Sequence, residues 1–220
     1  MKIRKMVIFD LDGTLLDTLD DLTDSVNYVL EKNGFPRRSH EEIRSFIGSG
    51  SAVLIKNSLP EDKGEYFEAC HDEFKQYYRD HSKIKTKAYD GIVDLLKLLK
   101  SRGILLSVVS NKPDFAVGTL CKYYFGDLLS SSVGDRAGVA KKPSAEPVFL
   151  AMKELGCEKA VFVGDSEVDV LTASNADLPC VAVTWGFRDK AELIKAGAEH
   201  CADNASQLKE KIFTLLGEKE

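Results

Sequence analysis

Four short polar clusters in this sequence combine the residue types that transfer of a phosphoryl group requires. That reaction needs a nucleophile, a cation, donors for the phosphoryl oxygens and a group that manages the proton of the leaving oxygen. Each cluster follows an apolar run, and ligands of open α/β sheets bind beyond the carboxyl ends of the strands. The clusters are Asp10-Leu11-Asp12-Gly13-Thr14, Ser110-Asn111, Lys142-Pro143 and Gly164-Asp165-Ser166-Glu167-Val168-Asp169.

The first cluster holds groups for both the attack and the proton transfer. Asp10 can act as the nucleophile, because a carboxylate attacks phosphorus to form an acyl phosphate. Asp12 lies two residues further on, where it can reach the leaving oxygen while Asp10 attacks from the other side. Gly13 lets the backbone approach the phosphate closely, and Thr14 adds a hydroxyl donor. Taken alone, two aspartates in a surface turn would indicate little.

The second and third clusters supply further donors for the substrate. Ser110 offers a second hydroxyl and Asn111 an adjacent amide, while Lys142 brings a positive charge to the nucleophile and the phosphate. Structural alternatives remain open for each. Ser110-Asn111 also suits the end of a strand and the start of a helix, and a lysine before Pro143 is ordinarily solvated.

The aspartates together predict a divalent metal ion. If Asp10, Asp12, Asp165 and Asp169 converge, four negative charges meet before an anionic substrate arrives, and Lys142 alone cannot balance them. A hard cation with oxygen ligands can, and Mg²⁺ suits carboxylates combined with phosphate oxygens. The acidic run 165–169 would equally suit the start of a helix, where acidic residues favour the helix dipole.

The elements that must position these residues alternate between buried strands and helices. Apolar runs at 3–9, 104–109, 160–163 and 180–184 predict strands, the first three ending at Asp10, Ser110 and Gly164. Helical stripes between them, such as 92–99 and 148–155, end at Gly103 and Gly156. This alternation predicts an α/β fold with a doubly wound, mostly parallel sheet.

Residues 19 to about 85 interrupt the alternation with helical stripes and no convincing strand. We expect residues 17–85 to form an inserted helical cap domain, and residues 1–16 and 86–220 to form the catalytic core. Linkers are expected near 16–18 and 86–89. Trp185, Phe187 and Arg188 follow the last apolar run and either line the rim of the site or pack in the core.

Composition excludes several classes of function. The chain has 220 residues, 44% apolar content and a net charge of -5, which argues against a nucleic-acid partner. We expect no membrane partner, because the apolar runs are only strand-length and no leader opens the sequence. Five scattered cysteines are expected to be idle thiols in a cytoplasmic protein. The expected state is a monomer or homodimer acting on a small phosphorylated metabolite.

The order of these motifs resembles the haloacid dehalogenase (HAD) superfamily, whose core is Rossmann-like. D-x-D-G-T, S-N, K-P and G-D-x-x-x-D cover the core, and the helical block is similar to the superfamily's cap. Within it, the chain looks most like phosphoglycolate phosphatases, whose cap loop typically has an Arg followed by G-x-G; here the matching stretch is Arg44-Ser45-Phe46-Ile47-Gly48-Ser49-Gly50. One departure is Asp177, where relatives usually have a glycine.

The resemblance implies a role for each motif residue. Asp10 would be the nucleophile, and Asp12 the general acid and base with its backbone carbonyl on the metal. Ser110 and Lys142 would bind phosphate, Lys142 being preferred to Lys141 because it abuts the proline. Asp165 would bind Mg²⁺ directly. Asp169 would act as a ligand through water or from behind the direct ligands.

The resemblance also implies the reaction, hydrolysis of a phosphate monoester through an aspartyl-phosphate. The best candidate substrate is 2-phosphoglycolate, with Arg44, Gly48 and Gly50 binding its carboxylate. Alternatives are a sugar-phosphate phosphatase and an enzyme like β-phosphoglucomutase, which shares the core. A dehalogenase would not need Asp12. A phosphoaccepting receiver would place its aspartate on a mid-chain strand and would lack the helical insertion.

Overall fold

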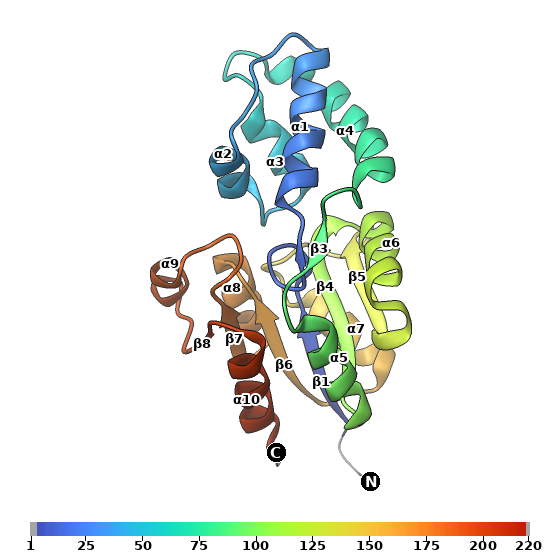
Figure 1. The fold of residues 1–220 in the computed structure, drawn as a ribbon, viewed down its shortest axis with the longest axis vertical. Coiled ribbons are helices and arrows are strands. Elements are labelled where there is room, and N and C mark those ends of the chain that lie inside the picture. Colours follow the sequence, from blue (N-terminus) through green and yellow to red (C-terminus); the bar gives the residue numbers. More distant parts are fainter. Residues whose placement is uncertain (1–3, 219–220) are drawn as a thin grey trace.

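The computed structural model describes residues 4–218. Its core is a parallel sheet, and the residues predicted to form the site lie at the carboxyl ends of its central strands. Every neighbouring pair of its strands runs parallel. Strand β1 lies between β4 and β6, so the two halves of the sheet diverge from it (Figure 1). The strand order is β5 (Ser131–Asp135), β4 (Leu105–Pro113), β1 (Lys5–Phe9), β6 (Lys159–Gly164), β7 (Cys180–Val183) and β8 (His200–Ala202).

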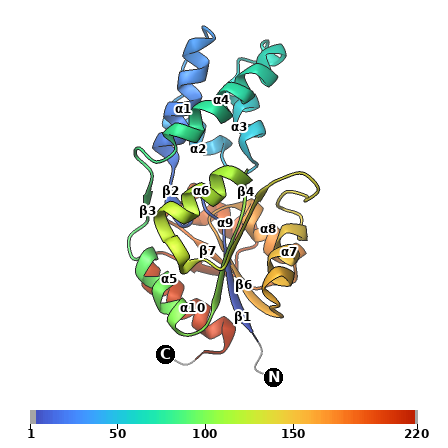
Figure 2. The ribbon, with the colours of Figure 1, turned by 90° about the vertical axis from the view of Figure 1, so that its right-hand side faces the viewer.

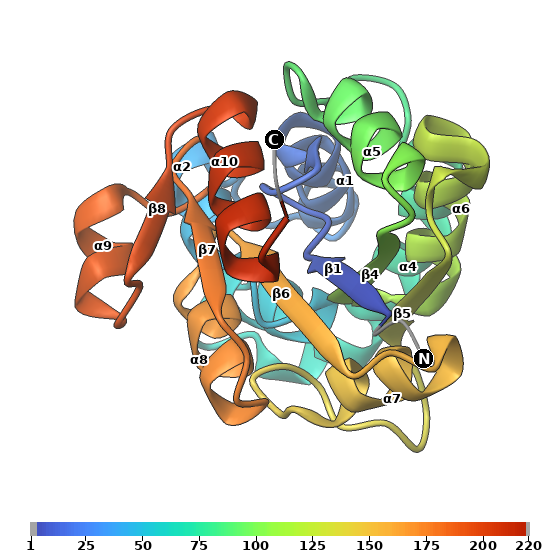
Figure 3. The ribbon, with the colours of Figure 1, turned by 90° about the horizontal axis from the view of Figure 1, so that it is seen from below.

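Helices cover both faces of the sheet, as Figure 3 shows from below. One face packs against α5 (Ile92–Ser101), α6 (Asp114–Phe125) and α10 (Ala205–Leu216). The other packs against α7 (Glu146–Leu155) and α8 (Glu167–Asn175), with α9 (Lys190–Lys195) beyond α8. Strand β1 is apolar throughout because Val7 and Phe9 point to the first face while Met6 and Ile8 point to the second. The predicted doubly wound fold is confirmed.

Four helices form a separate group, called the cap below, above the carboxyl edge of the sheet (Figures 1 and 2). They are α1 (Leu19–Lys32), α2 (His40–Phe46), α3 (Ser51–Ser58) and α4 (Phe67–His81), with the 3-10 turn Gly64–Tyr66 before α4. Their apolar stripes meet in a cluster distinct from the clusters on the sheet. A short antiparallel pair, β2 (Leu16–Asp17) and β3 (Lys87–Ala88), holds the two connections to the core together.

The strand boundaries differ from the predictions in two ways. Strand β4 does not stop at Ser110: it continues to Pro113, with a shift in register against β5 after Val109. Strands β5 and β8 and the β2–β3 pair were not predicted, because each is short or lacks an apolar run. Residue 3, the expected first strand residue, lies outside the described residues. Asp177 has φ 54, the left-handed conformation that favours glycine.

Two expectations from composition concern features of the fold. No helix among residues 4–218 is long and apolar enough to cross a membrane. The five cysteines are free thiols, of which Cys70, Cys121 and Cys157 are buried. These cysteines lie in different elements, as their scattered spacing suggested.

A buried carboxylate on α1 holds the returning connection of the cap. Asp21 is 2% exposed and accepts hydrogen bonds of 2.9–3.1 Å from the backbone amides of Ile84, Lys85 and Thr86. These amides have no helix or strand of their own to bind. Because buried backbone donors need partners, Asp21 fixes the path by which the chain leaves the cap.

Replacing this side chain should destabilise the protein measurably. We expect Asp21→Ala to lower the free energy of unfolding by about 3 kcal/mol, because several amides lose a charged acceptor. The matched control is Asp24→Ala on the same helix, whose carboxylate is 45% exposed and pairs with Lys85; it should cost less than about 1 kcal/mol. Denaturant unfolding measures both, and equal losses would contradict the assigned role of Asp21.

Candidate active site

The topology of the sheet brings the predicted clusters together. Strands β4, β1 and β6 are neighbours. Asp10 and Asp165 directly follow β1 and β6, and Ser110 lies in the last part of β4. Lys142 reaches the same place from the loop that precedes α7, and it is buried. Residues from four separate stretches of sequence therefore share one buried site.

Asp10 lies at the centre of this site. Its Oδ1 accepts hydrogen bonds from the backbone amide of Leu11 at 2.7 Å and from Lys142 Nζ at 2.9 Å. Both of these donors bind Oδ1, so Oδ2 is the oxygen available to a substrate. Burial raises the pKa of Asp10 to about 6; Lys142 opposes this rise, while Asp169 and Asp12 add to it.

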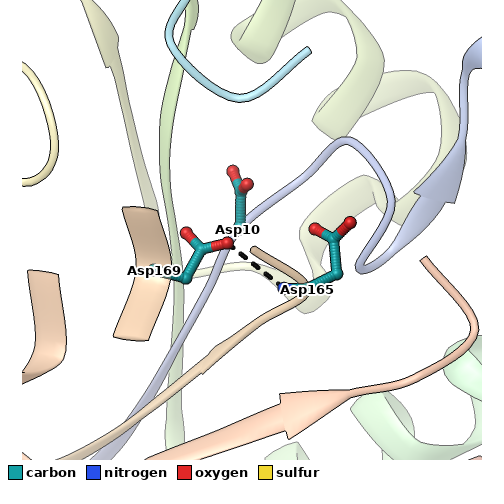
Figure 4. Close-up of side chains that lie close together, drawn as sticks. All are labelled: Asp10, Asp165 and Asp169. Carbon is teal, nitrogen blue, oxygen red and sulfur yellow. Dashed lines mark hydrogen bonds between the residues drawn. The ribbon is translucent and has the colours of Figure 1, made fainter. Parts of the chain in front are cut away.

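Asp169 supports the site from behind. Its Oδ1 accepts from Lys142 Nζ at 2.7 Å. Its Oδ2 accepts from the amide of Asp165 (Figure 4). The same oxygen also accepts from the amide and the hydroxyl of Ser166. Both oxygens are thus occupied by the protein, and the side chain is fully buried. The same contacts form a capping box at the start of α8. The structural interpretation of this segment is therefore confirmed, and its part in metal binding stays a prediction.

Asp165 is the carboxylate with the least positive charge nearby. It accepts from Thr14 Oγ1 at 3.0 Å and from the amide of Phe187 at 2.7 Å. Burial raises its pKa well above the ordinary value, and Asp169 and Asp10 add to the rise. Thr14 is fully buried, so its hydroxyl orients Asp165 in place of the predicted contact with phosphate. A Cβ on Gly13 (φ +79) would lie 2.2 Å from Asp165 Oδ2, which requires glycine there.

Asp12 is held by a lysine that sequence analysis missed. Lys112 Nζ lies 3.0 Å from each carboxylate oxygen of Asp12, and its side chain is 3% exposed. Thr18 Oγ1 donates to Asp12 Oδ1 at 2.8 Å. Burial alone would lower the pKa of Lys112, but Asp12 and Tyr78 raise it above its usual range, so Lys112 is charged. The one signal in the sequence was its place directly after Ser110-Asn111.

A cavity of about 50 Å³ opens between these groups and the cap. Asp10, Asp12 and Ser110 border it from the core; substrate binding by Ser110 stays a prediction. Its cap side is mostly apolar, with the loop 48–50 at one edge. The apolar lining consists of Leu22, Ile47, Leu54, Phe74, Phe187 and the ring of Tyr78.

Asn111 joins the core to the cap loop. Its amide group donates to the carbonyls of Gly48 at 3.1 Å and Lys142 at 2.9 Å, and its side-chain oxygen accepts from the amide of Lys142. The side chain therefore positions two loops, although it was predicted to bind substrate. Gly50 (φ +93) approaches so closely that a Cβ would lie 2.9 Å from the Asn111 carbonyl. Gly48 and Gly50 both border the cavity.

Arg44 lies outside the cavity. It is exposed and donates to the carbonyl of Gly186 at 3.2 Å. Arg188 makes the reverse contacts, donating to the carbonyls of Arg44 and Ile47 while it pairs with Glu167 at 2.9 Å. The two arginines thus link α2 to the core loop, and Arg44 does not face the position predicted for a substrate carboxylate.

Comparisons with known proteins agree with this geometry. The sequence model of a family described as haloacid dehalogenase-like hydrolase matches residues 7–183. The chain belongs to this family. Phosphoglycolate phosphatase 1 of Pseudomonas aeruginosa is 34% identical, covering 94% of this chain and 79% of that protein. Phosphoglycolate phosphatase of Chromobacterium violaceum is 33% identical, with 94% and 96% covered.

A solved structure is similar over the whole chain. The crystal structure of a proposed phosphoglycolate phosphatase from Lactobacillus delbrueckii subsp. bulgaricus is 36% identical, with a TM-score of 0.89 and coverage of 99% and 100%. These relatives place the chain with the HAD-like hydrolases that act on phosphoric monoester bonds.

The charges of this HAD-like hydrolase fit a divalent cation. Asp10, Asp165 and Asp169 offer carboxylate oxygens within 4.8 Å of one another. Asp12 belongs to the same site, but its carboxylate faces Lys112. Four carboxylates against Lys112 and Lys142 leave two negative charges, which a divalent ion would neutralise. The raised pKa values of Asp10 and Asp165 have the same cause, since excess negative charge and burial both favour the proton.

Thermal unfolding should reveal this charge. Because the pKa of Asp10 is raised in the folded state, the metal-free protein loses stability as pH rises from 3.8, the ordinary value, to about 6. Mg²⁺ should replace the lost protons and raise Tm more at about pH 7.5 than at about pH 5. Asp165→Asn should diminish the increase. Equal increases at both pH values, or in the variant, would contradict a metal site here.

Proposed function

We propose that the protein is a Mg²⁺-dependent phosphatase that hydrolyses a small phosphate monoester through an aspartyl-phosphate on Asp10. The observation that supports this most directly is the pairing of two carboxylates with two separate buried lysines at one cavity. Lys142 contacts Asp10 and Lys112 contacts Asp12. A nucleophile and a proton-transfer group are thereby held apart, each in its own hydrogen-bonded setting.

In the first step, Asp10 attacks phosphorus, a bond forms between its carboxylate oxygen and the phosphoryl group, and the bond to the leaving oxygen breaks. Asp12 gives a proton to that oxygen as it leaves. In the second step, Asp12 takes a proton from water, which attacks the phosphorus and releases phosphate from Asp10. Lys142 and Ser110 hold the phosphoryl oxygens during both steps.

Mg²⁺ would be held by Asp10 and Asp165 and by the backbone carbonyl of Asp12, with Asp169 behind them. When bound, it neutralises the excess charge of the carboxylates and of the phosphoryl group that approaches them. Asp169, whose two oxygens are already occupied, contributes by orienting Lys142 and the loop that carries Asp165.

The cap supports the choice of substrate. We propose that residues 17–85 form a cap domain that closes on a core of residues 1–16 and 86–220. The cavity beneath the cap, about 50 Å³, matches a leaving group of a few heavy atoms, since one water needs about 10–15 Å³ by the same measure. A small phosphorylated acid fits this volume, with 2-phosphoglycolate as first candidate, and relatives carry the name phosphoglycolate phosphatase.

The nucleophile is tested by Asp10→Asn. The amide has the same shape but cannot attack phosphorus, so turnover should fall by more than about a thousandfold. The control is Asp94→Asn, because Asp94 is 86% exposed and far from the site on α5. Wild-type enzyme quenched during turnover should carry a phosphoryl group on Asp10, detected by mass spectrometry of its peptides. Residual activity above about a thousandth, with the fold intact, would rule Asp10 out.

The substrate is tested by kinetics. In the presence of Mg²⁺, kcat/KM for 2-phosphoglycolate should exceed the values for hexose phosphates and nucleoside monophosphates by at least about tenfold, because their leaving groups do not fit the closed cavity. A clear preference for a hexose phosphate would overturn the proposed substrate while leaving the phosphatase reaction intact.

A further inference from the structure

Two buried polar side chains, Tyr78 and Lys112, lie beside Asp12, and the proposed reaction gives neither of them a contact with the substrate. Tyr78 projects from cap helix α4 and is 2% exposed, yet its hydroxyl makes no hydrogen bond within the described residues. Lys112 Nζ lies 4.5 Å from the centre of the Tyr78 ring. A lysine has only donors, so the hydroxyl proton of Tyr78 finds no acceptor there. A buried hydroxyl left in this state is costly.

The surroundings limit what can satisfy this hydroxyl. Both residues line the cavity, and their neighbours there include the apolar side chains of Leu22, Leu54 and Phe74. Of these five side chains, only Lys112 and Tyr78 can donate a hydrogen bond to a negatively charged ligand atom at this end of the cavity. Burial raises the pKa of Tyr78 to about 12, so the hydroxyl carries its proton at neutral pH.

The position of these donors relates them to the leaving group. Asp12 is the residue proposed to protonate the leaving oxygen, and Lys112 contacts both oxygens of Asp12. Lys112 has three N–H donors, and its close polar neighbours are the carboxylate of Asp12 and the hydroxyl of Tyr78. A short leaving group that takes its proton from Asp12 would therefore have its far end near Lys112 and Tyr78, which line the same cavity.

We propose that Lys112 and Tyr78 form the subsite that binds the carboxylate of the substrate's leaving group. The proposal rests on the proposed function, whose first candidate substrate has such a carboxylate, and it assigns recognition to these two residues in place of Arg44. Arg44 is exposed outside the cavity. A carboxylate can accept hydrogen bonds from Lys112 and from the Tyr78 hydroxyl, whereas an uncharged alkyl group offers no acceptor and leaves the Tyr78 hydroxyl unsatisfied.

The test compares two substrates that share the transferred phosphoryl group. In 2-phosphoglycolate the leaving group ends in a carboxylate, and in ethyl phosphate it ends in a methyl group. Tyr78→Phe keeps the ring and removes only the hydroxyl, so KM for 2-phosphoglycolate should rise roughly tenfold while kcat/KM for ethyl phosphate stays within about twofold. Lys112→Met should reduce the ratio of the two kcat/KM values by at least roughly tenfold.

For Lys112→Met the decisive measurement is the ratio of the two kcat/KM values. Loss of the contact between Lys112 and Asp12 lowers the rate for both substrates alike and leaves this ratio unchanged. Two controls match the changes outside the cavity. Tyr77→Phe alters the neighbouring position on α4, where the ring stacks on Tyr28 and His81. Lys85→Met removes a lysine that is 49% exposed. Neither should move the ratio.

The outcomes separate the two proposals. If the wild-type enzyme prefers 2-phosphoglycolate but Tyr78→Phe and Lys112→Met keep the wild-type ratio, the subsite is wrong and the proposed function stands. If the wild-type enzyme does not prefer 2-phosphoglycolate to ethyl phosphate, the proposed substrate fails and the subsite fails with it. Tyr78→Phe is the smaller change. If Lys112→Met does not fold, the result for Tyr78→Phe alone tests the subsite.

Discussion

The structure depends on an excess of negative charge buried at the carboxyl edge of the sheet. Asp10, Asp165 and Asp169 lie within 4.8 Å of one another, and Asp12 is two residues away. Ionised groups out of water are unfavourable unless they are paired, which explains why both lysines of the site are themselves buried. Lys142 bridges Asp10 and Asp169, and Lys112 holds Asp12. What remains is an excess of negative charge, which the proposed divalent cation would neutralise.

Holding such charges in place requires close backbone packing around them. A Cβ on Gly164 would lie 2.3 Å from Asp169, and the start of α8 binds Asp169 through the amides of Asp165 and Ser166. The helix N-terminus favours negative charge and so offsets part of the desolvation. The segment 165–169, which we propose to take part in binding the metal, is thus positioned by the same contacts that begin α8, so the two have little freedom to move separately.

The positions that sequence revealed are those where a buried parallel strand ends at a polar residue. Asp10 and Asp165 follow strands that are covered by helices on both faces. Such strands are apolar at nearly every position, so the first polar residue marks clearly where each strand ends. Lys112 could not be recognised, because a lysine in a short polar stretch looks solvated unless its partners are known. Those partners, Asp12 and Tyr78, are distant in sequence. Strand β8, only His200–Ala202, has too few residues to give a pattern.

The cavity is lined partly by the core and partly by the cap, so binding of the proposed substrate is linked to closure of the cap on the core. Lys112 lies on β4 of the core and Tyr78 on α4 of the cap, so the two donors adjoin one another only when the cap rests on the core. Asn111 and Arg188 hold the loop 47–50 against the same edge by hydrogen bonds to its carbonyls. A ligand that satisfies both donors stabilises this closed arrangement relative to an open one. In the proposed reaction, such closure over the bound substrate would keep bulk water away from Asp10 while the phosphoryl group is transferred.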